Sequence, residues 1–210
     1  ESIRMGEQWY KMNKATNFKE FYDALKIQGI ACLNVVYADT EDNIYFLSNG
    51  RLPERDPNYD WSTVLPGNTS ATLCDGNTVS LDSLPQVLNP ECGWVFNTNN
   101  TPYSASDNQD NFVETALNKT MGFQGVGLEN NRSSRFLELI NQYDSLSYDD
   151  FKRIKYDRQY PSKMILPSAT NLEMLMNLDA TKYPDIADAI NLLSTWDRQT
   201  YLGNTSAPLF

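Results

Sequence analysis

The sequence predicts an α+β fold, with antiparallel strands in the first half of the chain and helices in the last third. Two runs of β-branched and aromatic residues, 33–37 and 44–48, are joined by a short polar segment, as in a β-hairpin. In the last third, apolar residues instead recur every three or four positions, the spacing of amphipathic helices. The 210 residues, 40% of them hydrophobic, can bury a substantial core in one large or two small domains.

An amphipathic helix is expected before the hairpin and should pack on the sheet. Asn17 and Glu20 have the spacing of an N-cap and the third helical position, and Gly29 marks the expected end of the helix. The apolar residues that recur on one helical face are Phe18, Phe21, Tyr22 and Leu25.

The two hairpin strands should pair antiparallel, with Val35 and either Ile44 or Phe46 facing apolar layers. From residue 51 to residue 90 the chain has prolines at positions 53, 57, 66, 85 and 90 and almost no periodicity. A long irregular stretch of this kind usually covers or shapes a site.

A half-buried strand at 94–96 is expected to lead into a run of amides before Pro102, where the strand cannot continue. The amides are those of Asn97, Asn99 and Asn100. A carboxamide fixed at a strand end can donate its NH₂ protons to an oxygen that becomes negative during a reaction, as in an oxyanion hole. The alternative is that Asn and Thr gather here because they form turns.

Helices are expected in the last third of the chain. Ser147 begins one of them with a capping residue, and Pro184 opens the last one. The helical stripes are assigned to the core, and their members are Arg135, Phe136, Leu139, Ile140 and Tyr143, then Phe151 and Ile154, then Ile186, Ala189, Ile190, Leu193 and Trp196.

Composition excludes several classes of function. A net charge of −10 without a basic patch argues against nucleic-acid binding, and no apolar run is long enough for a membrane span. The chain has no histidine, which removes Ser-His-Asp and Cys-His catalysis and the commonest zinc ligand. Any chemistry must therefore use hydroxyls, amides, carboxylates or a terminal amine.

The three cysteines are far apart and form no CxxC pair, so a zinc ribbon or a thioredoxin-type site is not expected. Cys32 lies in an apolar run and is assigned to the core. Nothing in the sequence fixes the distance between Cys74 and Cys92, so a disulfide between them is the minority expectation.

Several short motifs occur in an order that resembles one enzyme family. They are Asn34-Val-Val-Tyr-Ala-Asp39, Asn43-Ile-Tyr-Phe-Leu-Ser-Asn-Gly50, Leu52-Pro-Glu-Arg55, Val64-Leu-Pro-Gly67, Leu84-Pro85 and Asn89-Pro-Glu-Cys-Gly93. From about residue 5 onward, the chain resembles the β chain of the penicillin acylase family. These N-terminal nucleophile hydrolases include penicillin, acyl-homoserine-lactone and cyclic-lipopeptide acylases. The resemblance implies part of an αββα sandwich, with a helix, sheet and loops in residues 1–103 and a mainly helical part in 104–210.

The resemblance also implies roles for two residues. In the family, the second Asn of an Asn-x-Asn motif before a proline donates its amide to the oxyanion, and the matching residue here is Asn99. Asn97 and Asn100 would then form the turn, so their replacement should affect stability rather than rate. The family's arginine near the reaction centre matches Arg132, with Arg135 as the rival, although an arginine in a first helical turn is usually a solvated charge.

The family's nucleophile is a serine at the first position of the β chain, whose own α-amino group serves as the base because it titrates near neutral pH. This chain begins with Glu1, and Ser2 has its amine in a peptide bond. We therefore expect the chain to be an internal fragment of the β chain, truncated at both ends and inactive alone.

Further site residues follow from the same resemblance. Trp61 and Trp94 are candidates for the substrate cleft, although a single aromatic residue is more often core. Asp107 matches a family ligand of a structural calcium ion, which needs six to eight oxygen ligands. Together with Asp110 it supplies only a few of them, so an incomplete site or a solvated acidic turn is expected. No organic cofactor is implied.

The function predicted from the sequence is therefore that of part of an amide hydrolase. Its substrates would be small N-acyl amides such as a β-lactam side chain, an acyl-homoserine lactone or a lipopeptide. The resemblance implies an α chain from the same precursor as partner and a periplasmic or secreted bacterial location. The alternative is a non-catalytic ligand-binding or structural module that retains the scaffold.

Overall fold

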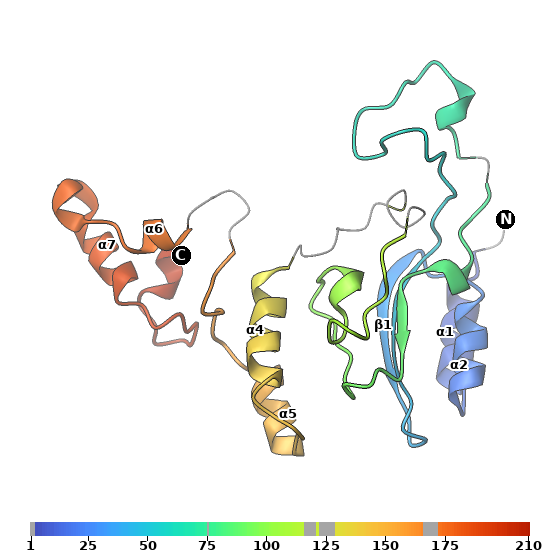
Figure 1. Cartoon of the computed structure of the whole chain (residues 1–210), viewed down its shortest axis with the longest axis horizontal. Helices are drawn as coiled ribbons and strands as arrows, with labels where there is room; N and C mark the ends of the chain where they lie inside the picture. Colours follow the sequence, from blue (N-terminus) through green and yellow to red (C-terminus); the bar gives the residue numbers. More distant parts are fainter. Residues whose placement is uncertain (1–2, 75, 116–120, 122–128, 166–171) are drawn as a thin grey trace. The chain divides into compact units, whose positions relative to one another are not determined.

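The computed structural model describes residues 3–74, 76–115, 121, 129–165 and 172–210 (Figure 1). The chain divides into two compact units, Glu1–Leu128 and Glu129–Phe210. The first unit contains the sheet, and the second is built from helices and turns.

Two helices open the first unit, α1 (Met5–Lys14) and α2 (Phe18–Leu25). The predicted cap of α2 is confirmed, because the Asn17 side chain accepts a hydrogen bond from the Glu20 backbone N–H. The predicted end at Gly29 is wrong, since α2 ends at Leu25. Gly29 serves a different purpose: a Cβ atom there would lie 2.5 Å from the Arg4 carbonyl carbon, so only glycine lets the chain pass the start of α1.

The sheet has three antiparallel strands in the order β1 (Cys32–Ala38), β2 (Ile44–Gly50) and β3 (Gln86–Leu88). The predicted hairpin is thus confirmed, but β3 lies in a stretch predicted as loop. It is short, and Val87 pairs with Phe46 from a distant part of the chain. The strand predicted at 94–96 is also wrong, because its contact with Ala105 is a single backbone hydrogen bond from Phe96.

The two faces of the sheet are covered by different parts of the first unit. Val35 and Leu47 face the main core, which includes residues of α1 and α2 (Figure 1). Phe46 lies on the opposite face, where it packs on Val87 and Ala105. Val35 and Phe46 therefore face apolar layers as predicted, which places the 95–105 segment against the face away from the helices.

The second unit contains α4 (Asn131–Ile140), α5 (Tyr148–Lys155), α6 (Leu172–Met176) and α7 (Ala187–Ser194). Ser147 caps α5 in a capping box with Asp150, as its position predicts. Pro184 opens a 3₁₀ turn rather than α7 itself, and Trp196 lies beyond the end of α7 although it is buried. The core of this unit consists of Met164, Leu172, Met176 and Trp196.

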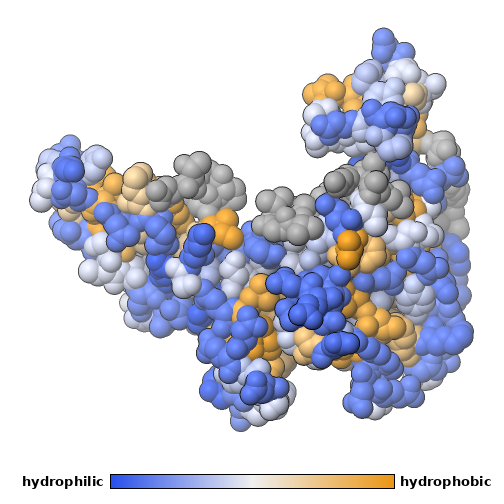
Figure 2. Space-filling view, viewed as in Figure 1, coloured by the Kyte–Doolittle hydropathy of each residue, from blue (hydrophilic) through white to orange (hydrophobic). Residues whose placement is uncertain are grey.

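Some apolar side chains assigned to the core are on the surface. Phe151 is 53% exposed, and Cys32 is exposed at the start of β1, one of the two edge strands, on the side away from the main core. Figure 2 shows hydrophobic patches interrupting a mainly hydrophilic face. Cys74 and Cys92 are free thiols, as expected.

Candidate functional site

The candidate site centres on residues 97–100, which we call the amide loop. The Asn97 side chain folds back on this loop, and its Oδ1 accepts a hydrogen bond of 2.9 Å from the Asn99 backbone N–H. The same oxygen accepts a second bond of 3.0 Å from Nδ2 of Asn34 in β1. The oxygen of Asn97 is therefore committed to holding the loop.

Asn100 is the buried amide of the loop, only 7% exposed. Its Oδ1 accepts from the Thr98 backbone N–H at 2.9 Å, and its Nδ2 donates to the Ser104 carbonyl at 2.9 Å and to the Thr101 carbonyl at 3.2 Å. Both ends of this carboxamide are used within the turn, which supports the structural role predicted for it.

Asn99 is exposed and has a backbone φ of +58°, a left-handed conformation that Asn tolerates better than most residues. Its backbone N–H is bound by Asn97, so the position of its Cα is fixed while its side chain reaches the surface. An exposed carboxamide on a fixed backbone is suited to donate to an external oxyanion. The sequence predicts that replacing Asn97 affects stability rather than rate. Because the Asn97 side chain binds the Asn99 backbone N–H, we expect Asn97→Ala to affect the rate as well.

The two candidate arginines lie in α4 of the second unit and differ in their surroundings. Arg132 is exposed at the second position of the helix. Arg135 is 19% exposed and binds both carboxylate oxygens of Asp157, from Nε at 2.9 Å and from Nη2 at 3.0 Å, with Glu138 at 3.2 Å. Arg135 is therefore a half-buried structural ion pair rather than a solvated charge, which favours Arg132 as the exposed candidate.

Replacing Arg135 by methionine should lower the free energy of unfolding by about 1–3 kcal/mol, because a partly buried carboxylate loses its charged hydrogen bonds. The hydrogen bond from Arg135 holds the pKa of Asp157 below its ordinary value. This stabilisation is complete above the unfolded pKa of about 4 and is lost as the pH falls through the folded value. Chemical denaturation at pH 7 should therefore give a lower free energy of unfolding for Arg135→Met than for the unchanged protein. This difference should become smaller under acid conditions.

The control is Arg153→Met, which removes an arginine 70% exposed from the surface of α5. Surface pairs of this kind contribute little, so the stability should change by about 0.5 kcal/mol or less. If the difference in the free energy of unfolding between Arg135→Met and the unchanged protein did not depend on pH, the ion pair between Arg135 and Asp157 would not be its cause.

The two tryptophans predicted for the cleft are half-buried in the first unit. Trp61 donates from Nε1 to the Asp56 carbonyl at 2.8 Å, and the Arg55 guanidinium lies 5.2 Å from its ring centre. Trp94 lies three residues before the amide loop, with its ring 5.8 Å from that of Phe96. Trp94 is thus close in the chain to the candidate site, whereas the contacts of Trp61 are within its own turn.

Asp107 and Asp110 lie on the turn that follows the amide loop. Asp107 Oδ1 accepts from the Asn108 backbone N–H at 2.7 Å, and Asp110 Oδ2 accepts from the Cys92 backbone N–H at 3.0 Å. The hydrogen bond from Cys92 lowers the pKa of Asp110. In the part of the chain that the structure describes, no three acidic or thiol side chains gather as metal ligands. These two carboxylates alone do not fit the oxygen-rich coordination of Ca²⁺.

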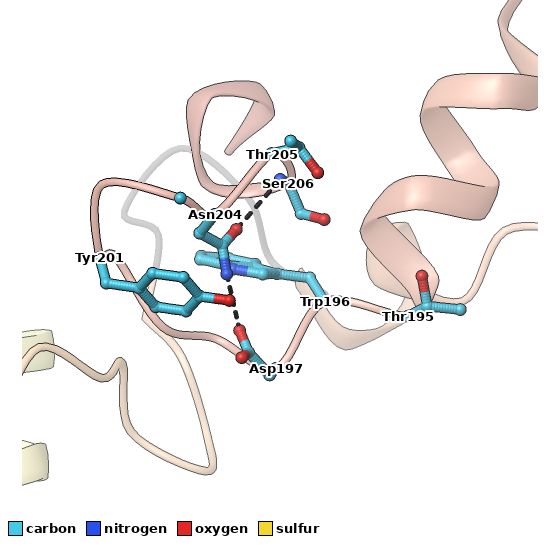
Figure 3. Close-up of a pocket in the computed structure, with 8 residues that line it drawn as sticks. Thr195, Trp196, Asp197, Tyr201, Asn204, Thr205 and Ser206 are labelled. Atoms are coloured by element: carbon cyan, nitrogen blue, oxygen red, sulfur yellow. Dashed lines mark hydrogen bonds between the residues drawn. The ribbon is translucent and has the colours of Figure 1, made fainter.

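A polar hollow of about 210 Å³ lies at the end of the second unit (Figure 3). Asn204 crosses it, donating from Nδ2 to Asp197 at 2.9 Å and accepting from the Ser206 backbone N–H at 3.0 Å. These polar groups hold their own turn together, and the prediction of a site did not include them. The residues that line the hollow are Thr195, Trp196, Asp197, Tyr201, Gly203, Asn204, Thr205 and Ser206.

Glu1 and Ser2 lie outside the described residues, so the structure does not bear on them. Among the residues that are described, no helix is both long and apolar enough to cross a lipid bilayer. Two functional candidates were not predicted from the sequence: Asn34, which donates to Asn97 of the amide loop, and Ser48, which donates to Asn34. Asn34 did belong to a motif that carries the family resemblance, but its contact across the sheet was not visible in the pattern.

The chain is similar to proteins of one known family. A sequence profile described as penicillin amidase matches residues 1–210. The penicillin G acylase of Escherichia coli is 32% identical over 102 residues, which are 47% of this chain and 12% of that protein. The solved structure of a thermostable penicillin G acylase from Alcaligenes faecalis matches with a TM-score of 0.58 and 22% identity, covering 92% of this chain and 32% of the other.

The structural match confirms the predicted fold class, part of the sandwich of N-terminal nucleophile hydrolases. The chain belongs to the penicillin amidase family, because the family profile extends over its whole length. It spans about a third of the solved relative and a smaller share of the curated one.

Proposed function

We propose that this chain is part of the β chain of an amide hydrolase that cleaves small N-acyl amides, with Asn99 as an oxyanion donor. The observation that carries the proposal is the amide loop: Asn97 and Asn100 hold the backbone, and Asn99 presents its carboxamide at the surface. Family membership supports amide hydrolysis as the reaction class.

In the proposed reaction, an N-terminal serine from a segment outside residues 1–210 attacks the amide carbonyl, and its α-amino group takes the proton. The carbonyl oxygen becomes negative in the tetrahedral intermediate, where the Asn99 Nδ2 protons stabilise it. The intermediate expels the amine and leaves an acyl-serine, which water hydrolyses. Arg132 is the proposed cation near the reaction centre, and Trp94 a proposed wall of the acyl pocket.

Partners and location are part of the same proposal. The companion is an α chain from the same precursor, and the enzyme acts outside the bacterial cytoplasm. The acyl group would be that of a β-lactam side chain, a homoserine lactone or a lipopeptide, and the reaction needs no organic cofactor. Any calcium ion in the whole enzyme would need most of its ligands from segments other than 103–111.

The proposal is tested by expressing the complete coding sequence that contains this chain and assaying chromogenic N-acyl substrates with short and long acyl groups. We expect turnover, and N-terminal sequencing of the β chain should find serine. A complete protein that is neither processed nor active would favour a non-catalytic module on this scaffold.

A chain of residues 1–210 alone should show no turnover, because it has a proposed oxyanion donor but neither the terminal nucleophile nor its amine base. The matched control is the same chain with Ser2→Ala. Activity that persists in that variant would contradict the assignment of the nucleophile to another segment.

A further inference from the structure

A line of side-chain hydrogen bonds connects the sheet to the backbone of Asn99. Ser48 Oγ in β2 donates to Asn34 Oδ1 in β1 at 3.2 Å, and Asn34 Nδ2 donates to Asn97 Oδ1 at 3.0 Å. The Asn99 backbone N–H donates to that same oxygen at 2.9 Å. The candidate oxyanion donor is therefore attached to two strands through two intermediate amides.

The orientation of both intermediate amides follows from their partners. A backbone N–H can only donate, so the atom of Asn97 that faces Asn99 must be its oxygen. The atom of Asn34 that faces this oxygen must then be its NH₂ group. That leaves the oxygen of Asn34 for the Ser48 hydroxyl, which can donate. Each group therefore has one consistent role along the line.

The strand end of this line is rigidly placed. Ser48 is 6% exposed, and its backbone N–H donates to the Pro85 carbonyl at 2.9 Å. Asn34 lies opposite Ser48 in the β1–β2 ladder. The Arg51 N–H to Ala31 carbonyl bond shows that odd-numbered residues of β1 form the hydrogen-bonded pairs. Asn34 and Ser48 thus form a non-hydrogen-bonded pair, in which side chains lie closest.

We propose that Asn34 is a positioning residue that keeps Asn99 in its donating geometry through Asn97. The left-handed backbone of Asn99, with φ of +58°, is sparsely populated by non-glycine residues and needs support. Asn97 supplies that support, and Asn34 fixes Asn97. This inference rests on the proposed function, because it concerns how the proposed oxyanion donor is held.

The test uses the complete processed enzyme with Asn34→Ala. We expect kcat to fall by about 10-fold with KM nearly unchanged, since a small misplacement of a reacting group has effects of this order. Hydrogen exchange of a peptide spanning residues 97–101 should also become faster, because the Asn99 amide loses a fixed acceptor. Val36→Ala is the matched control: it shortens a half-exposed side chain on the same strand and face and should change neither measurement.

A double variant separates positioning from a general structural effect. If Asn34 acts through Asn99, then Asn34→Ala should lower kcat no further in an enzyme that already carries Asn99→Ala. An equal fall in both backgrounds would overturn the proposal, and so would normal kcat for Asn34→Ala in an enzyme where Asn99→Ala is impaired. Normal kcat for Asn99→Ala would instead overturn the oxyanion assignment itself, and the role of Asn34 with it.

Discussion

Replacing Asn99 by alanine in the complete processed enzyme should lower kcat by about 10²–10³-fold, or roughly 3–4 kcal/mol of transition-state stabilisation. The reason is that the carboxamide meets a negative oxygen that exists only as the tetrahedral intermediate forms. Substrate binding in the ground state should change much less, so the effect should fall on kcat rather than on KM. Steady-state kinetics on an N-acyl substrate, with circular dichroism to verify folding, measure both.

Two variants of nearby asparagines serve as controls for this experiment. Asn108 is exposed on the turn after the amide loop, and Asn108→Ala should leave kcat and stability unchanged. Asn100→Ala removes a buried carboxamide with bonds to Thr98 and Ser104, so its main effect should be a lower melting temperature. Near-normal kcat for Asn99→Ala would show that the Asn-x-Asn motif has been assigned in the wrong register.

Local sequence signals predicted those parts of the fold that depend on neighbouring residues. The caps at Asn17 and Ser147 and the β1–β2 hairpin are determined by residues within a few positions of one another, and all are found as expected. In contrast, β3 exists because Val87 reaches Phe46 across about forty residues of irregular chain. Such a pairing leaves no periodic signal in three residues.

In the candidate site, too, residues that depend on near neighbours in the chain were predicted and those that depend on distant partners were not. Asn99 was predicted from a short motif that resembles one of a known family, and such a motif consists of contiguous residues. The roles of Asn34 and Arg135 depend on partners far along the chain, Asn97 and Asp157 respectively. The sequence places Arg135 in the apolar stripe of its helix and also allows a solvated charge, and only its hydrogen bonds to Asp157 decide between the two.

Helix α1 shows that apolar patterns in a sequence do not predict every buried side chain, because its most buried side chain is polar. Gln8 is 0% exposed, whereas Trp9 and Tyr10 on the same helix are 41% and 64% exposed. The apolar residues Met5, Trp9 and Met12 recur at helical spacing, but apolar periodicity alone does not identify Gln8 as the buried side chain. The burial is explained by two contacts: Gln8 Oε1 accepts from the backbone N–H groups of Gly29 at 2.7 Å and Ile30 at 2.9 Å.

Replacing Gln8 by methionine should lower the free energy of unfolding by about 1–4 kcal/mol. Two backbone N–H groups would lose their acceptor at about 1–3 kcal/mol each, and part of this loss is offset because the buried Gln8 Nε2, which has no hydrogen-bond partner among the described residues, is removed as well. Methionine is unbranched and of similar length, so the loss is not confused with that of a large cavity. Asn13→Met, at an exposed position of α1, is the control and should change stability little.

Chemical denaturation of the complete protein gives the magnitude of the loss in stability, and hydrogen exchange over residues 26–31 shows where the structure is weakened. Because Gly29 passes within contact of the start of α1, weakening this junction should increase exchange at Gly29 and Ile30 before the sheet is affected. Unchanged exchange at these two amides would show that Gln8 is not what holds α1 to the chain before β1.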